Sequence, residues 1–213
     1  MHSLEKHLLP NREVFASDPF GYATLAWSRW ALAKELAGFP VDVERPPTTR
    51  DLKSPVLWLT QAHALSQAAI IVLRSQPNFD HIPVSTQGVC DSQFCAVGLM
   101  LVGYSLEVCL KAMLIIRKGI DVFTAEEIQF RNHQLEELAE FLPNLSEKDR
   151  AMLRLLTYFV MWAGRYPDPG SGREQQAQAI FALSEKHQIA GRDLFDLASR
   201  VMGQATFEID ASE

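Results

Sequence analysis

Two charged residues, Glu107 and Lys111, stand in the middle of a largely apolar run between residues 94 and 119. They are four residues apart with the acid first, which is the favourable order for two charges on one helix face. Charges in apolar surroundings are costly unless they are paired. We therefore expect an ion pair, which either fixes the register of a buried helix or forms part of a ligand site.

Three further polar residues, His133, Arg165 and Tyr166, stand beside predicted helices. If they meet Glu107 and Lys111 at one end of the fold or along one groove, the five together suit a phosphate or a carboxylate. Each also has a structural alternative. The imidazole would pack at a helix start, the guanidinium would cap the carbonyls that end its own helix, and the phenol ring would be buried.

Helical periodicity predicts the elements that position these residues, and no stretch has a strand pattern. Serine followed by proline marks one helix start at residue 54, and capping-box patterns mark others at Thr124 and Ser146. The expected helices cover 19–38, 54–74, 94–119, short segments from 124 and 133, 146–164 and 173–202.

This order of helices predicts an all-α chain, an antiparallel bundle of four to five helices with an extra N-terminal helix. Residues 1–50 would form an arm and accessory helix, 54–202 the bundle and 203–213 a tail. Trp27 and Trp30 give the accessory helix a large apolar face, which would pack on the bundle, dock a partner or complete a dimer.

The composition is that of an ordinary soluble protein, with 47% apolar and 22% charged residues in 213. A net charge of −6 argues against a long nucleic-acid footprint. Three cysteines, an odd number, indicate reduced thiols and a cytoplasmic location. We expect no cofactor and no metal site, since no cofactor motif or metal-ligand spacing is present.

The apolar run 94–119 is long enough to cross a bilayer. The charges of Glu107 and Lys111 at its middle argue against that role, and the N-terminus has no secretory pattern. We therefore predict no membrane association.

Three motifs in order resemble the HEPN family, helical domains named for a proposal of nucleotide binding in higher eukaryotes and prokaryotes. They are a Glu-x-x-x-Lys-Ala helix at Glu107, a His-x-Leu helix start at His133, and Arg-Tyr-Pro at 165–167 after the next helix. The resemblance covers roughly residues 54–202. It implies a bundle of four or five helices, a homodimer, and Glu107, Lys111, His133, Arg165 and Tyr166 as candidate ligand-binding residues.

For function, the resemblance implies nucleotide or RNA ligands, a defence or toxin–antitoxin context, and a protein partner such as a nucleotidyltransferase. Nuclease members of the family carry an arginine followed within four to six residues by a histidine. Here Arg165 has no histidine after it until His187. We therefore expect a non-catalytic module that binds a nucleotide, another anion or a protein. The alternative is a ribonuclease or toxin that uses Arg165 with His133 or His81.

Overall fold

The structure, a computed structural model, describes residues 8–42 and 44–210. Every regular element in these residues is a helix, so the prediction of an all-α fold is confirmed. The chain divides into two compact units, Met1–Leu57 and Trp58–Glu213. The predicted boundaries at residues 50 and 54 lie just before this division.

The first unit contains α2 (Arg12–Ser17), α3 (Pro19–Ala23), α4 (Ala26–Leu36) and α5 (Thr49–Leu52). The single helix predicted over 19–38 is wrong, because the chain turns at Thr24, whose hydroxyl donates to the carbonyl of Gly21. Trp27 on α4 is buried, and the Lys34 ammonium lies 4.9 Å from the centre of one of its rings.

The sequence predicted no helix between residues 38 and 54, where the structure has α5. Thr48 and Asp51 form a complete capping box there, with each side chain bonded to the other residue's backbone. Hydrogen bonds from Thr48, together with the nearby Arg45, lower the pKa of Asp51 to about 2.

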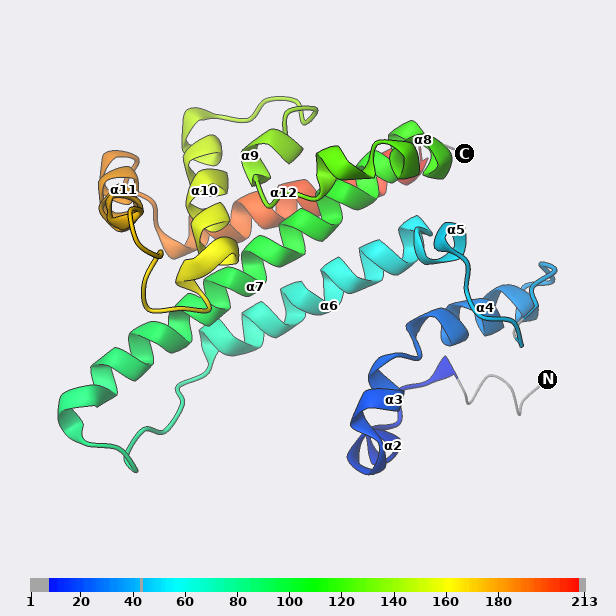
Figure 1. Cartoon of the computed structure of the whole chain (residues 1–213), viewed down its shortest axis with the longest axis horizontal. Coiled ribbons are helices and arrows are strands. Elements are labelled where there is room, and N and C mark those ends of the chain that lie inside the picture. Colours follow the sequence, from blue (N-terminus) through cyan, green and yellow to red (C-terminus); the bar gives the residue numbers. More distant parts are fainter. Residues whose placement is uncertain (1–7, 43, 211–213) are drawn as a thin grey trace. The chain divides into compact units, whose positions relative to one another are not determined.

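Helix α7 (Val84–Lys118) runs through the second unit (Figure 1) and carries more buried residues than any other described helix. Helix α6 (Pro55–Arg74) starts at the end of the first unit and precedes α7 in the chain. The two helices lie side by side. Helix α7 packs most extensively against α12 (Gly191–Asp210). Leu106, Leu110 and Met113 of α7 are fully buried in the resulting core.

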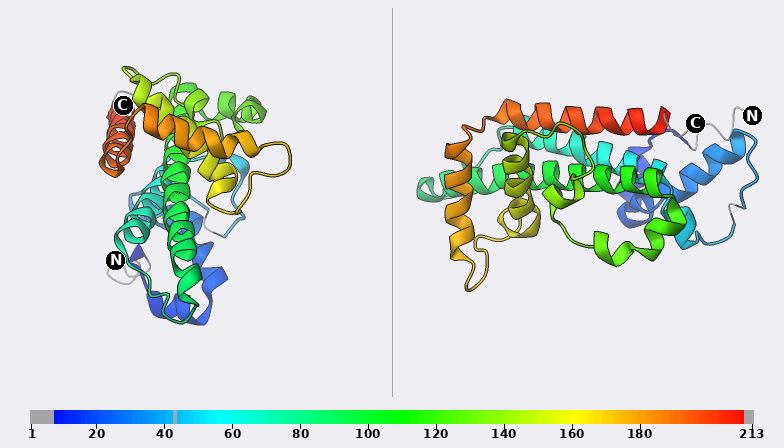
Figure 2. Two further views of the ribbon diagram at one scale, coloured as in Figure 1. Left: turned by 90° about the vertical axis from the view of Figure 1, so that its left-hand side faces the viewer. Right: turned by 90° about the horizontal axis from the view of Figure 1, so that it is seen from above.

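The connection between α7 and α12 is made of shorter helices: α8 (Ile120–Ala125), η2 (Glu127–Phe130), α9 (Leu135–Leu138), α10 (Glu147–Tyr158), the π-helical turn η3 (Phe159–Ala163) and α11 (Glu174–Lys186). Helices α9 and α10 pack on α7, and α10 also packs on α11. Figure 2 shows α11 lying across the direction of α12.

Two glycines let α7 and η3 approach closely. A β-carbon on Gly103 would stand 2.5 Å from Val160 Cγ2, and one on Gly164 would stand 2.4 Å from Met100 Cβ. Both distances are shorter than carbon atoms tolerate without displacement. The glycines therefore fix where η3 lies along α7.

Two helix starts in the second unit differ from prediction. The helix predicted from residue 94 begins at Val84, since an isolated glycine such as Gly88 costs only about 1 kcal/mol inside a helix. The capping box predicted at Thr124 is wrong. Thr124 lies inside α8, which begins at Ile120, and its hydroxyl donates to the Ile120 carbonyl.

The helix predicted over 173–202 is two helices. Gln188 takes a left-handed backbone, with φ of 47°, which ends α11. Asp193 accepts from the Ala190 amide at 2.7 Å and so supports the start of α12. Helix α12 then continues to Asp210, past the predicted end of the bundle at residue 202.

Helices α6 and α7 are both long and apolar enough to cross a membrane, judged by length and composition alone. Most of the apolar stretch of α7 is buried inside the protein, as in the core helix of a globular domain, whereas little of α6 is buried. This is weak support for a membrane span.

Candidate functional site

The carboxylate of Glu107 lies at the centre of a polar cluster on α7. Its Oε1 atom accepts from Lys111 Nζ at 2.7 Å, and its Oε2 atom lies 2.9 Å from His133 Nδ1. The side chains of Glu107 and Lys111 are only 7% and 11% exposed. The ion pair expected from the sequence is thus present, and it extends to a third residue.

The segment before α9 is held against α7 by the same cluster. Lys111 Nζ donates to the carbonyl of Asn132 at 3.3 Å, directly before His133. On the other side, the buried hydroxyl of Thr157 on α10 accepts from the Leu135 amide at 3.0 Å. The backbone around His133 is therefore anchored to two helices, which fixes the position of the imidazole.

His133 is the exposed edge of the cluster, with 41% of its side chain accessible. Its ring meets Tyr104 edge to face at 6.2 Å between centres. Because an ionised carboxylate only accepts, Nδ1 of His133 carries the proton shared with Glu107. Nε2 then remains for a ligand, as an acceptor when the ring is neutral and as a donor when it is protonated.

Arg165 and Tyr166 lie apart from this cluster. The Arg165 guanidinium donates to the carbonyl of Met161, the capping role that we considered as its structural alternative. Tyr166 is 59% exposed, with the guanidinium 5.6 Å from its ring centre, so the structural alternative of a buried ring does not hold.

The separation follows from the packing of η3. Gly164 lies against Met100, seven residues before Glu107 on α7, which is about 10 Å along the helix axis. The structure thus brings together Glu107, Lys111 and His133, and leaves Arg165 and Tyr166 at another level of α7.

Tyr104, Asn132 and Thr157 join the cluster without having been identified from the sequence. Tyr104 precedes Glu107 by three residues, a spacing that places two side chains on one helix face. This spacing could have identified Tyr104 from the sequence. The contacts of Asn132 and Thr157 depend on how separate elements pack, so no spacing along the chain predicts them.

Two other ion pairs connect distant parts of the second unit. Hydrogen bonds from Arg117, one of them 2.7 Å long from Nε, lower the pKa of Glu208 and tie the end of α12 to the end of α7. Burial alone would raise the pKa of Asp149, but hydrogen bonds from Arg200 and Ser146 outweigh it and lower that pKa.

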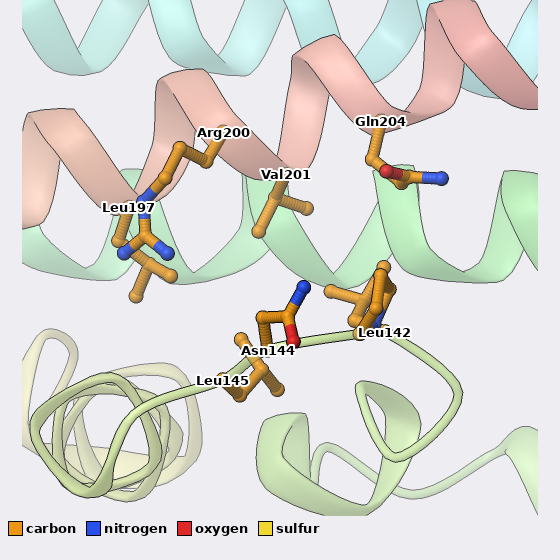
Figure 3. A pocket seen from close by; sticks show the side chains of 8 residues that line it. Leu142, Asn144, Leu145, Leu197, Arg200, Val201 and Gln204 are labelled. Carbon is orange, nitrogen blue, oxygen red and sulfur yellow. The ribbon is translucent and has the colours of Figure 1, made fainter.

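Figure 3 shows a pocket of about 280 Å³ between α12 and the turn that precedes α10. Leu197 and Val201 form its apolar wall, and Asn144, Arg200 and Gln204 lie at its polar edge. None of the five predicted ligand residues lines it. Its only guanidinium is already paired with the buried carboxylate of Asp149, so it lacks a free cation for an anionic ligand.

No group of three or more histidine, cysteine, aspartate or glutamate side chains suited to a metal ion occurs within residues 8–42 and 44–210. Comparison of the whole chain with protein-family models, with curated proteins and with solved structures gives no match in any of the three. The function is therefore inferred from the geometry of the site.

Proposed function

We propose that this chain is a HEPN-like helical module that binds a nucleotide or another anionic ligand without cleaving it. One observation carries the proposal: the half-exposed imidazole of His133 is held by the buried carboxylate of Glu107. The backbone on either side of His133 is held by Lys111 and Thr157, which fixes the ring. Little conformational entropy is therefore lost when a ligand binds to Nε2.

A nearby cation supports the choice of an anion. Arg131, two residues before His133, has a side chain that is 69% exposed. Its guanidinium lies 3.9 Å from Glu127 at the protein surface, a contact that contributes little to stability and is easily exchanged for a phosphate. Lys111 does not serve in this way, because Glu107 already neutralises it.

The placement of Arg165 favours binding over cleavage. A ribonuclease needs a base near the 2′-hydroxyl and a positive charge on the same phosphate. Arg165 bonds to a carbonyl of its own helix end, at a different level of α7 from His133.

The alternative function, a ribonuclease or toxin, is favoured by the pairing of Glu107 with His133. A carboxylate that orients an imidazole is the arrangement used for general bases. Arg131 would then have to replace Arg165 as the phosphate ligand.

We further propose that the chain forms an antiparallel bundle of four to five helices with an extra N-terminal helix, and that it is a homodimer in the cytoplasm. A protein such as a nucleotidyltransferase is the partner that the resemblance to HEPN domains suggests.

The test is a thermal melt of the protein with each of the four nucleoside monophosphates, inorganic phosphate and short RNAs. The RNA is recovered from the same tubes to detect cleavage. A ligand present at about one hundred times its dissociation constant stabilises by roughly 2.7 kcal/mol, which shifts the midpoint measurably. We expect stabilisation without cleavage.

Matched variants assign the site. His133→Ala should remove the shift, and His81→Ala, an exposed histidine on the loop before α7, should retain it. Cleavage that disappears in His133→Ala would establish the ribonuclease instead. If no nucleotide, phosphate or RNA changes the midpoint, the binding proposal is wrong.

A further inference from the structure

A second pocket, of about 320 Å³, lies where α6, α7 and α12 meet. Among the described residues, its lining consists of Leu59, Ala62, His63, Cys109, Met202, Ala205 and Thr206, which include no aspartate, glutamate, lysine or arginine. Its volume is at the lower end of the range for small-molecule sites, and junctions between packed helices are a common place for such sites.

Small side chains explain why the space is open. Ala62 on α6, Cys109 on α7 and Ala205 on α12 are all buried, and each lies at the junction. Larger residues at these positions would fill the gap, as Leu106 and Leu110 do in the adjoining core. The pocket is thus a hollow that is open to solvent on the side of His63 and Thr206, with these three small side chains at its base.

The lining chemistry restricts the class of ligand. A charged ligand would lose hydration without gaining an ion pair with an acidic, lysine or arginine side chain, because the described residues of the lining include none of these. Cys109 and Met202 supply two sulfur atoms, and sulfur makes favourable contacts with aromatic rings.

Polar groups occur only at the exposed edge of the pocket. His63 and Thr206 are exposed, and within the described residues neither side chain has a hydrogen-bond partner in the protein. Each can donate and accept. One hydroxyl or N–H on the ligand is therefore enough to satisfy this edge.

We propose that this pocket binds a neutral aromatic compound that carries one hydroxyl or N–H group. The ring lies between Ala62, Ala205 and the sulfur atoms, and the polar group points towards His63. The pocket is separate from the Glu107 cluster. Cys109 is two residues from both Glu107 and Lys111, about 200° around α7, so it faces the other side of the helix.

Isothermal calorimetry on the full-length protein tests the ligand class with four probes. Indole and phenol should bind saturably, and cyclohexanol and benzoate should bind at least about tenfold more weakly, since one lacks the ring and the other is charged. Equal binding of benzoate, or no binding of indole and phenol, would refute the proposal.

Methionine methyl resonances locate the site in the unmodified protein. Bound indole should shift the methyl signal of Met202, which lines the pocket, and leave that of Met152, which is buried in the core away from it. Equal shifts of both signals would place the ligand elsewhere or indicate a non-specific effect.

A filling substitution provides the variant test. Ala205→Leu should occupy the cavity, abolish indole binding and raise the melting midpoint, since filling a void adds contacts without a new polar cost. Undiminished binding in a folded Ala205→Leu protein would overturn the assignment. If this variant does not fold, His63→Ala should weaken phenol binding about tenfold while leaving toluene unaffected.

Discussion

Each oxygen of the Glu107 carboxylate has its own partner, Lys111 on one side and His133 on the other. Removal of this charge leaves a buried ammonium without its counter-ion, which is far more costly than loss of an exposed pair. We predict that Glu107→Gln lowers the free energy of unfolding by about 3 kcal/mol in urea denaturation at neutral pH.

The control for this prediction is the exposed pair between Lys118 and Glu126, whose side chains are 2.6 Å apart. Glu126→Gln should cost less than about 1 kcal/mol, because water and salt screen the attraction. If both variants lose the same small amount, the Glu107 pair is effectively hydrated and does not fix the helix register.

Asp149 gives a prediction for pH dependence. Its pKa is lower in the folded protein than its usual value of 3.8, so its contribution is fully present above that value. The contribution is lost as the pH falls through the lowered folded pKa. Asp149→Asn should destabilise by about 1–2 kcal/mol at pH 7, because it weakens the bonds with Arg200 and Ser146.

Chemical denaturation at several pH values measures this effect. The difference between wild type and Asp149→Asn should be constant from pH 7 to about pH 5 and should shrink below about pH 4. A difference that grows as the pH falls would mean that the folded protein binds a proton at Asp149 more readily than the unfolded chain does.

At the scale of elements, the contact between α7 and η3 has almost no spare room. A methyl group on Gly164 would meet Met100 Cβ and, at 3.0 Å, the backbone oxygen of Ala96. Backbone atoms in a long helix move less easily than a side-chain end. We predict that Gly164→Ala lowers the stability by about 1–3 kcal/mol in thermal or urea unfolding.

The matched control is Gly88→Ala on α7, where nothing lies within 4 Å of the new β-carbon. This change should raise the stability by about 0.5–1 kcal/mol, since alanine loses less backbone entropy than glycine in a helix. Loss of stability in both variants would point to a general sensitivity of α7 rather than to its contact with η3.

At the scale of the whole molecule, the cysteines report how the second unit opens. Cys109 is 1% exposed and burial raises the pKa of its thiol to about 12, whereas Cys95 is exposed on the same helix. Because the thiolate is the reactive form, Cys109 should resist alkylation in the native protein at pH 8.

Mass spectrometry after alkylation at increasing urea concentrations tests this expectation. Cys95 should be modified at once, and modification of Cys109 should follow the cooperative unfolding curve of the second unit. Rapid labelling of Cys109 without urea would show that the reagent reaches its thiol in the native protein, either through the pocket between α6, α7 and α12 or by local opening.

Much of the local structure could be predicted from the sequence, because it depends on residues close together in the chain. The start of α6 at Pro55, the capping box between Ser146 and Asp149, and the pairing of Glu107 with Lys111 are all observed. Each requires only a cap or two residues on one helix face. The all-α class follows from the same periodicity.

The tertiary structure decided which of these helices meet, and therefore which polar residues form a site. His133 reaches Glu107 because Lys111 and Thr157 hold its segment against two helices, whereas the close packing at Gly164 keeps Arg165 at another level of α7. The sequence placed all five candidate residues at helix ends or faces. Only the packing of distant elements selected three of them, because distances between helices depend on side-chain volumes that no spacing along the chain records.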